Sequence, residues 1–187
     1  GFEETEDAYV SGNQVMVSSQ VAGNISKINV DNMDPVQAGD VLLELDNTNA
    51  KLSFKQAKSN LANAVRQISQ LNYTVKQLKS AVRANEITLA QVQGNLNRRV
   101  QLVKDGAIDK ESFQHAKEAV ELAKANLTTS QNQLEANQAL LLDGPLSEQP
   151  QIQSAVSNLK QAWLNLERTK IRSPIKGYVA RRNAQVG

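Results

Sequence analysis

The sequence predicts an α+β chain in which a long antiparallel α-helical coiled-coil hairpin is inserted between two halves of a small β domain. Three observations lead to this fold class. Both ends of the chain alternate in the manner of strands, the middle repeats apolar residues at helical spacing, and one short phrase occurs at both ends. That phrase aligns residues 173–181 with residues 19–27 as Ser, any, β-branched, any, Gly, any, β-branched, any, base.

The composition argues against a thick globular core and against several classes of function. Only 4% of the 187 residues are aromatic, and aromatic side chains bury the most area per residue. The 21 basic and 19 acidic residues nearly balance, so the net charge gives no reason to expect nucleic acid as a partner. The absence of cysteine excludes disulfides and thiolate metal ligands. No run approaches the roughly 18 apolar residues of a membrane span.

Residues 7–46 are the first predicted half of the β domain. The segment QVMVSSQVAGNISKINV alternates β-branched and polar residues, and NMDPVQAGD has the composition of a turn. The segment VLLELD then indicates a buried strand. Within this half, residues 7–14 are expected to form a lead-in strand.

Residues 47–170 are the predicted helical hairpin. Its outgoing helix, about 57 residues long, repeats apolar positions at steps of 3 and 4 over seven heptads, which is typical of a coiled coil. The stripe consists of Phe54, Ala57, Leu61, Ala64, Ile68, Leu71, Val75, Leu78, Val82, Asn85, Leu89, Val92, Leu96, Arg99 and Val103. We interpret the two polar members, Asn85 and Arg99, as residues that specify the register of pairing. Arg99 also has an alternative role, which is to face a partner near the tip.

The returning side of the hairpin is predicted to consist of two helices. In KDGAID, Gly106 supplies a left-handed turn and Asp109 caps the next helix. A helix of about 34 residues follows, then a break at about 143–150 and a helix of about 22 residues. Because these lengths nearly match the outgoing helix and the tip at about 103–109 is short, the helices should fold back antiparallel over roughly 85 Å.

The charges of the two arms are opposite in sign. The outgoing arm from Ala50 to Lys104 carries ten Lys or Arg and one acid, Glu86. The second helix, counted from Asp109, has five acids and three lysines. This difference favours pairing of unlike arms, although each exposed pair contributes little.

Residues 171–187 are the second predicted half of the β domain, because strand chemistry returns at RTKIRSPIKGYV. A lone β-hairpin is only marginally stable in water, so neither half is expected to bury its apolar face alone. We therefore expect residues 7–46 and 171–187 to pair with each other.

Two half-motifs separated by a helical hairpin resemble the HlyD-like membrane fusion proteins, also called periplasmic adaptor proteins, of Gram-negative bacteria. The segments that carry the resemblance are DAYVSGNQVMVSSQVAG, NLNRRVQLV, NQALLL and, most specifically, AWLNLERTKIRSPIKGYVARRNAQVG. They are most similar to the EmrA-type adaptors of multidrug efflux, and the resemblance covers nearly the whole chain from Asp7. It implies that the β halves form a lipoyl-like domain, also called a barrel-sandwich hybrid.

The resemblance also implies a longer protein with a transport function. A transmembrane helix is expected before Gly1 and a β-barrel domain after Gly187, with residues 7–14 leading in from that barrel. The implied protein is a non-enzymatic adaptor, anchored to the inner membrane and located in the periplasm. As a homo-oligomer, it would link an inner-membrane major-facilitator drug:proton antiporter to an outer-membrane TolC-like channel.

Two alternatives to the efflux adaptor stay open at this point. An adaptor of a type I protein-secretion system has the same architecture. A coiled-coil scaffold without a transport role would instead use the outgoing arm to form a parallel homodimer.

The hairpin tip is the candidate functional site. Adaptors of related pumps dock the channel with an Arg, a Leu four residues on and a Ser eleven residues on. Here Arg98 and Leu102 match, and Asp109 stands in the place of Ser. Apolar residues at an exposed end often mark a docking surface, although these residues have the alternative role of closing the hairpin. The predicted docking set is Arg98, Leu102, Val103, Gly106, Ile108 and Asp109.

No pattern indicates a cofactor, a metal or catalysis. Lys51 lies near the place of a lipoyl lysine but continues into heptad sequence, so a lipoyl or biotinyl carrier is not favoured. His115 has no Cys or second His to complete a metal site. Trp163 falls on the stripe of the third helix and is expected to pack against the outgoing arm. The sequence contains no Ser-His pair, phosphate loop or convergent carboxylates.

Overall fold

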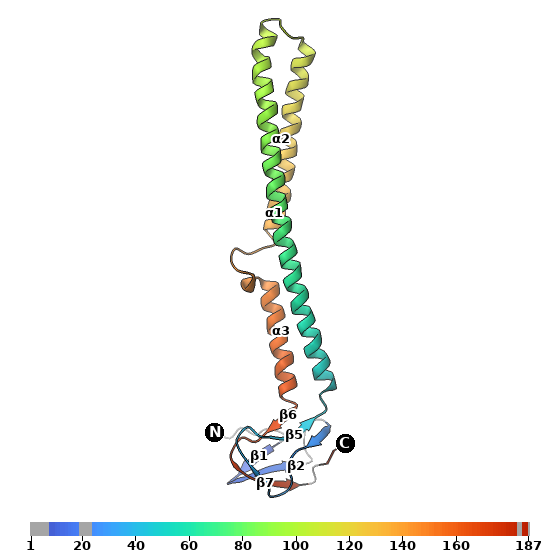
Figure 1. Ribbon diagram of the computed structural model, residues 1–187, viewed down its shortest axis with the longest axis vertical. Coiled ribbons are helices and arrows are strands. Elements are labelled where there is room, and N and C mark those ends of the chain that lie inside the picture. The colour runs from blue at the N-terminus through green and yellow to red at the C-terminus, as the bar shows by residue number, and fades with distance from the viewer. Residues whose placement is uncertain (1–7, 19–23, 183–184, 187) are drawn as a thin grey trace. The chain divides into compact units, whose positions relative to one another are not determined.

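The computed structural model describes residues 8–18, 24–182 and 185–186. The chain divides into two compact units, one formed by Gly1–Ala62 with Ser154–Gly187 and the other by Asn63–Gln153. Strands at both ends of the chain flank a helical hairpin in the sequence, so the predicted fold class is confirmed (Figure 1). The phrase predicted to occur twice lies partly outside the described residues, at 19–23.

The β part of the first unit contains two small sheets. One sheet has the strand order β1 (Ala8–Ser11), β2 (Gln14–Ser18), β7 (Gly177–Arg182) and β4 (Pro35–Val36). The other has the order β3 (Ile25–Ile28), β5 (Val41–Leu45) and β6 (Lys170–Arg172). Each sheet therefore contains strands from both ends of the chain, as expected if neither half is stable alone.

The two halves are joined by a parallel pairing of β2 with β7. In this register Val15 lies opposite Val179 and Gln14 lies opposite Tyr178. The buried apolar side chains of both halves form one core, which consists of Val15, Val17, Ile25, Val36, Leu42, Leu43, Ile171 and Val179. Burial of these residues requires both ends of the chain, because Ile171 and Val179 come from the second half.

Four helical segments lie between β5 and β6: α1 (Thr48–Lys104), α2 (Lys110–Gln138), the short 3-10 helix η1 (Leu146–Glu148) and α3 (Pro150–Glu167). Asp46 caps the start of α1, since its Oδ1 accepts hydrogen bonds from the Thr48 backbone N–H at 3.0 Å and the Thr48 hydroxyl at 2.8 Å. The bond from the Thr48 backbone is the main cause that lowers the pKa of Asp46 below its ordinary value. Every residue of the predicted α1 stripe is buried or half-buried.

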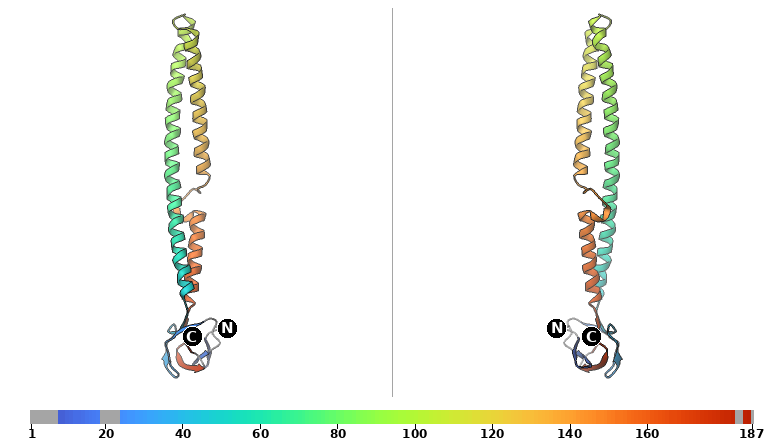
Figure 2. Two further views of the ribbon diagram at one scale, coloured as in Figure 1. Left: turned by 90° about the vertical axis from the view of Figure 1, so that its right-hand side faces the viewer. Right: turned by 90° about the vertical axis from the view of Figure 1, so that its left-hand side faces the viewer.

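In the unit Asn63–Gln153, α2 runs alongside α1 in every view (Figures 1 and 2). Asn85 crosses between them, because its Nδ2 donates to the backbone carbonyl of Asn126 at 3.3 Å. This bond agrees with the predicted role of Asn85 in fixing register. The α1 stripe of this unit therefore faces α2 of the same chain, which argues against a scaffold that uses the stripe to pair with a second outgoing arm.

The opposite charges of the arms are not used as ion pairs within this unit. Residues 63–153, all of which the structure describes, contain the pairs Arg83–Glu86, His115–Glu111 and Lys124–Glu121, each within one helix. No ion pair in residues 63–153 links α1 to α2. The two helices instead bury apolar and small side chains, among them Val75, Val120 and Ala123.

The second helix ends earlier than predicted. It stops at Gln138, whereas the break was expected at 143–150. The final turn tightens, because the N–H groups of Leu140 and Leu141 bond to carbonyls three residues earlier, those of Asn137 and Gln138. The side chain of Gln149 then forms hydrogen bonds with both the N–H and the carbonyl of Leu142, so these two groups cannot take part in a continuing helix.

The expectation for Trp163 was wrong. Its side chain is exposed, and the neighbouring Ala162 is buried instead. In α3 the buried or half-buried positions are Ile152, Ala155, Val156, Leu159, Ala162, Leu166 and Glu167, and the run 155, 159, 162 and 166 is spaced by 4, 3 and 4 residues. This spacing puts Ala162 on the buried face of α3, so the next residue, Trp163, lies just beyond the face that packs on α1.

None of the helices in the described ranges is both long and apolar enough to span a bilayer.

Gly177 provides a test of the contact between the two β halves. A Cβ at this position would collide with the backbone carbonyl oxygen of Asn13, which also accepts the Tyr178 N–H at 2.9 Å. We predict that Gly177→Ala lowers the stability of the β domain by about 2 kcal/mol, a typical cost of overpacking. Urea denaturation followed by NMR of the β2 and β7 amides measures this change.

Gly94→Ala is the matched control. A Cβ there would meet only Arg98 Nη1, at 3.7 Å, which is an ordinary contact. Alanine in the interior of α1 should stabilise the helix by about 1 kcal/mol. Unchanged stability of Gly177→Ala would contradict the close approach of the two halves.

Candidate functional site

The turn at the tip is a compact helix terminus built around Gly106. The Gly106 N–H bonds to the Val103 carbonyl at 3.2 Å, and the Ala107 N–H bonds to the Leu102 carbonyl at 2.9 Å. With Gly106 at φ 71°, this pair of bonds is a Schellman motif. The left-handed turn predicted for Gly106 is therefore confirmed, and it ends α1 at Lys104.

Asp109 caps the start of α2, as predicted. Its Oδ1 accepts the Ser112 backbone N–H at 3.1 Å, and its own backbone is extended, at φ −78° and ψ 164°. The hydrogen bonds from Ser112 stabilise the carboxylate and lower the pKa of Asp109 from its ordinary value of 3.8. Asp109 thus performs the structural task that a Ser would perform at this position.

The apolar residues of the tip remain accessible. Leu102 is 41% exposed, and Val103 and Ile108 are half-buried. Gly106 and Asp109 are exposed. The Schellman motif and the Asp109 cap satisfy six hydrogen-bonding groups around this turn. A partner at the tip would therefore meet apolar side chains on a backbone that hydrogen bonds already fix.

The two arginines of the tip lie in different environments. Arg98 is exposed, and its Nη2 donates to the side-chain oxygen of Asn95. Arg99 is half-buried, and its Nη1 donates to the Asn95 backbone carbonyl at 3.4 Å. Within the described residues Arg99 makes no hydrogen bond to α2, so it does not link the helices as Asn85 does.

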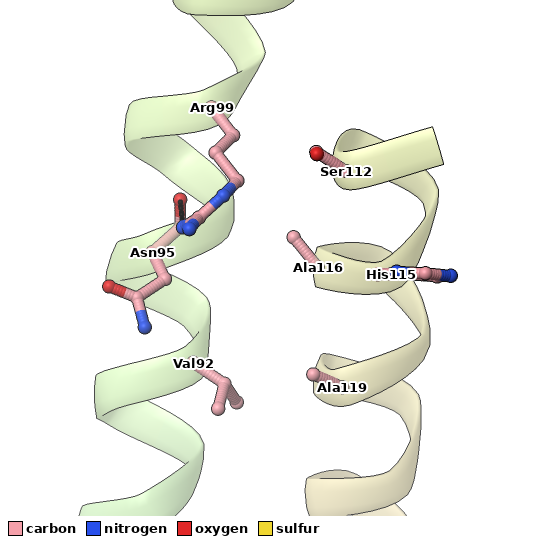
Figure 3. A pocket seen from close by; sticks show the side chains of 7 residues that line it. All are labelled: Val92, Asn95, Arg99, Ser112, His115, Ala116 and Ala119. Carbon is pink, nitrogen blue, oxygen red and sulfur yellow. Dashed lines mark hydrogen bonds between the residues drawn. The ribbon is translucent and has the colours of Figure 1, made fainter. Parts of the chain in front are cut away.

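A cavity of about 320 Å³ lies beside Arg99 and is lined by Val92, Asn95, Arg99, Ser112, His115, Ala116 and Ala119. Ser112, Ala116 and Ala119 project from α2 toward α1 (Figure 3). Because the side chains opposite Arg99 are short, the two helices leave space there. Arg99 was singled out from the sequence, whereas Ser112, Ala116 and Ala119 were not, although small residues at steps of 4 and 3 opposite a long side chain are a signal of such a gap.

The remaining candidates are surface residues. The side chain of His115 is 66% exposed, and its Nε2 lies 3.8 Å from Glu111 Oε1. Lys51 is exposed in the first turn of α1. Among the described residues, no group of three His, Cys, Asp or Glu side chains is arranged to hold a metal ion.

A helical hairpin inserted between paired β halves, with a capped apolar tip, is the architecture of membrane fusion proteins. The family model that matches the chain is described as the EMRA alpha-helical hairpin domain, and it covers residues 48–169. The chain therefore belongs to the EmrA family. This membership confirms the predicted resemblance and agrees with a non-enzymatic chain.

Curated relatives match over almost the whole chain. The multidrug export protein EmrA of Haemophilus influenzae is 80% identical over 186 residues, which are 100% of this chain and 48% of that protein. EmrA of Escherichia coli is 47% identical over the same coverage. The fatty acid resistance protein FarA of Neisseria gonorrhoeae is 42% identical, covering 98% of this chain and 47% of its own length. The chain thus spans about half the length of the curated relatives it matches.

Solved structures with a similar arrangement include one titled as the periplasmic adaptor protein EmrA. It is 19% identical, has a TM-score of 0.45, and covers 88% of this chain and 64% of its own. The membrane fusion protein Spr0693 from Streptococcus pneumoniae is 18% identical with a TM-score of 0.48, covering 88% of this chain and 48% of its own.

The cap at Asp109 generates a pH prediction. Because the folded-state pKa is below the ordinary 3.8, the carboxylate stabilises the folded tip fully above about pH 4. That stabilisation is lost as the pH falls through the folded pKa. We predict that the Ser112 amide nitrogen shift titrates with a midpoint below 3.8, as measured by NMR.

Two variants separate the cap from other roles of Asp109. Asp109→Ala should speed hydrogen exchange of the amides of residues 110–113 at neutral pH, whereas Asp109→Ser should keep them protected. Asp109→Ser should also remove the titration of the Ser112 amide. A midpoint at or above 3.8, or equal exchange in the alanine variant and the natural sequence, would contradict the cap.

Proposed function

We propose that this chain is the hairpin-bearing part of a periplasmic adaptor subunit in a tripartite multidrug efflux pump. The observation that carries the proposal is 80% identity, across the full chain, to a relative named as a multidrug export protein. A second relative at 47% identity has the same name, and another at 42% is named for fatty acid resistance. Export and resistance are thus the recurring terms among these relatives.

In the proposed pump, the adaptor links an inner-membrane major-facilitator drug:proton antiporter to an outer-membrane TolC-like channel. It acts in the periplasm, is anchored to the inner membrane by a segment outside this sequence, and works as a homo-oligomer. Residues 7–46 and 171–187 form the lipoyl-like domain and residues 47–170 form the hairpin. No cofactor takes part, since the task is mechanical connection.

The tip is proposed to dock the channel through Arg98, Leu102, Val103, Gly106, Ile108 and Asp109. Leu102 presents a 41% exposed side chain next to the turn, and burying such a side chain against a partner stabilises a complex by about 1.5–3 kcal/mol at most. The Schellman motif and the Asp109 cap fix the backbone on both sides, so little conformational entropy is lost on docking. Arg98 adds guanidinium donors at the rim, next to Asn95.

The proposal predicts that Leu102→Asp in the full-length protein abolishes drug resistance in cells. The carboxylate would be desolvated on docking without a partner, which costs several kcal/mol. Ile108→Asp should act in the same way. The minimum inhibitory concentration of a pump substrate measures the effect, and circular dichroism establishes that the variant protein is folded.

Leu122→Asp is the matched control. Leu122 is 64% exposed on α2, sixteen residues before its end and away from the tip. Cells with this variant should keep resistance. If cells with Leu102→Asp and cells with Ile108→Asp both keep resistance at the natural level, the proposal that the tip docks the channel is wrong.

A further inference from the structure

The segment between α2 and α3, residues 139–149, exposes three leucines and is called the leucine loop below. Leu140 is 60% exposed, Leu142 is 56% exposed and Leu146 is 38% exposed. Isolated apolar residues on a surface need no explanation, but three within seven positions of one loop form a patch. The patch lies within residues 63–153, outside the docking set of the tip.

The leucine loop is held in place by a buried amide. Gln149 is 3% exposed, its Oε1 accepts the Leu142 N–H at 3.1 Å, and its Nε2 donates to the Leu142 carbonyl at 2.7 Å. The side chain therefore replaces the two backbone partners that a strand or helix would give Leu142. This arrangement fixes the loop with its leucines outward.

The hairpin also carries unused charge complementarity. Residues 63–85 of α1 contain four bases and no acid: Arg66, Lys76, Lys79 and Arg83. Residues 125–153 contain three acids and no base: Glu135, Asp143 and Glu148. All seven are exposed, and no ion pair within residues 63–153 joins the two arms. Arg83 pairs with Glu86 on its own helix, and the other six charges make no ion pair among the described residues, so they can meet the charges of another molecule.

The basic side of α1 includes an exposed aromatic ring. Arg66, Tyr73, Lys76 and Arg83 follow at steps of 7, 3 and 7 residues, which places them along one side of the helix and off the stripe. Tyr73 is 70% exposed, and Lys76 Nζ lies 5.1 Å from the centre of its ring. This set, called the Tyr73 face below, suits a partner that offers apolar side chains together with carboxylates.

The loop and the Tyr73 face lie at about the same level along the hairpin. The Asn85–Asn126 bond aligns the antiparallel helices. Tyr73 precedes Asn85 by twelve residues and Gln138 follows Asn126 by twelve, so the end of α2 is level with Tyr73 at about 1.5 Å per residue. A second copy lying side by side in the same direction would therefore bring its leucine loop to this level.

We propose that the leucine loop of one copy docks on the Tyr73 face of a second copy of the chain. The leucines cover the ring of Tyr73, and Asp143 and Glu148 meet Lys76 and Arg83. This inference rests on the proposed homo-oligomer and names its contact. Because the two surfaces differ, the contact is heterologous, and its repetition around an axis gives a ring where the rotation between neighbouring copies closes.

The test uses cysteine crosslinking; this chain has no natural cysteine, and any cysteine elsewhere in the full-length protein is first replaced by serine. Two differently tagged copies of the full-length protein are expressed together with its transporter, one with Leu142→Cys and the other with Tyr73→Cys. Since the periplasm is oxidising, a disulfide should form between the copies and give a product that carries both tags. Reversing the charges with Asp143→Lys and Glu148→Lys in the first copy should remove that product, and Lys76→Glu and Arg83→Glu in the second should restore it.

Leu122→Cys paired with Tyr73→Cys is the matched control. Leu122 has similar exposure but lies sixteen residues from Gln138, about 24 Å along the axis, which is beyond disulfide reach. An equal yield from the control pair would overturn the proposal, and so would no Leu142–Tyr73 product in a protein whose native mass is that of an oligomer. If the oligomeric protein gives no Leu142–Tyr73 product but the cells keep normal drug resistance, the proposed contact is wrong and the proposed adaptor function stands. A native mass of one copy would overturn the homo-oligomer as well.

Discussion

The parallel pairing of β2 with β7 joins the two ends of the described chain, and the remaining structure depends on it. Gln14 lies opposite Tyr178 and Ser18 lies opposite Arg182, so five residues from each end share one ladder. Closing so long a loop costs conformational entropy, but this cost grows only with the logarithm of loop length. The offsetting gain is the shared core, in which Val15 and Val17 pack with Val179 and Ile171.

The same pairing makes the hairpin an insertion. The Leu45 N–H bonds to the Thr169 carbonyl at 2.7 Å, so the chain leaves the β domain before α1 and returns after α3 at adjacent points. Whatever lies between Asp46 and Thr169 does not need to contribute to the β core. Capping at Asp46 and at Asp109, and the Schellman motif at Gly106, then determine where the helices begin and end.

Much of this structure could be predicted from the sequence, because it follows from local patterns. The 3,4 spacing specified the buried face of α1, and the chemistry of Gly106 and Asp109 specified the turn. The errors concern contacts between segments. The side chain of Gln149 bonds to Leu142, just after α2 ends at Gln138, and no local sequence propensity predicts that bond. Trp163 was misplaced because the stripe of α3 uses the small Ala162, and hydrophobicity alone favoured the larger neighbour.

The candidate site was predicted in part. Residues of the tip were found from their position and from the family resemblance, and the structure places Leu102, Ile108 and Asp109 around one turn. The cavity beside Arg99 was not found, since it arises from the short side chains of α2 opposite that arginine. The sequence shows the opposite charges of the two arms, but their exposure and the lack of ion pairs between α1 and α2 in residues 63–153 follow only from the three-dimensional structure.

The most direct measurement replaces residues 48–168 with a two-residue Asn-Gly turn, joining Asn47 to Thr169 where the backbone ends are already adjacent. If the two halves form one domain by themselves, NMR of this shortened chain should show nuclear Overhauser contacts between β2 and β7, including Val15 with Val179, and cooperative unfolding. A spectrum typical of an unfolded chain, or strands that form without contacts between β2 and β7, would contradict the account.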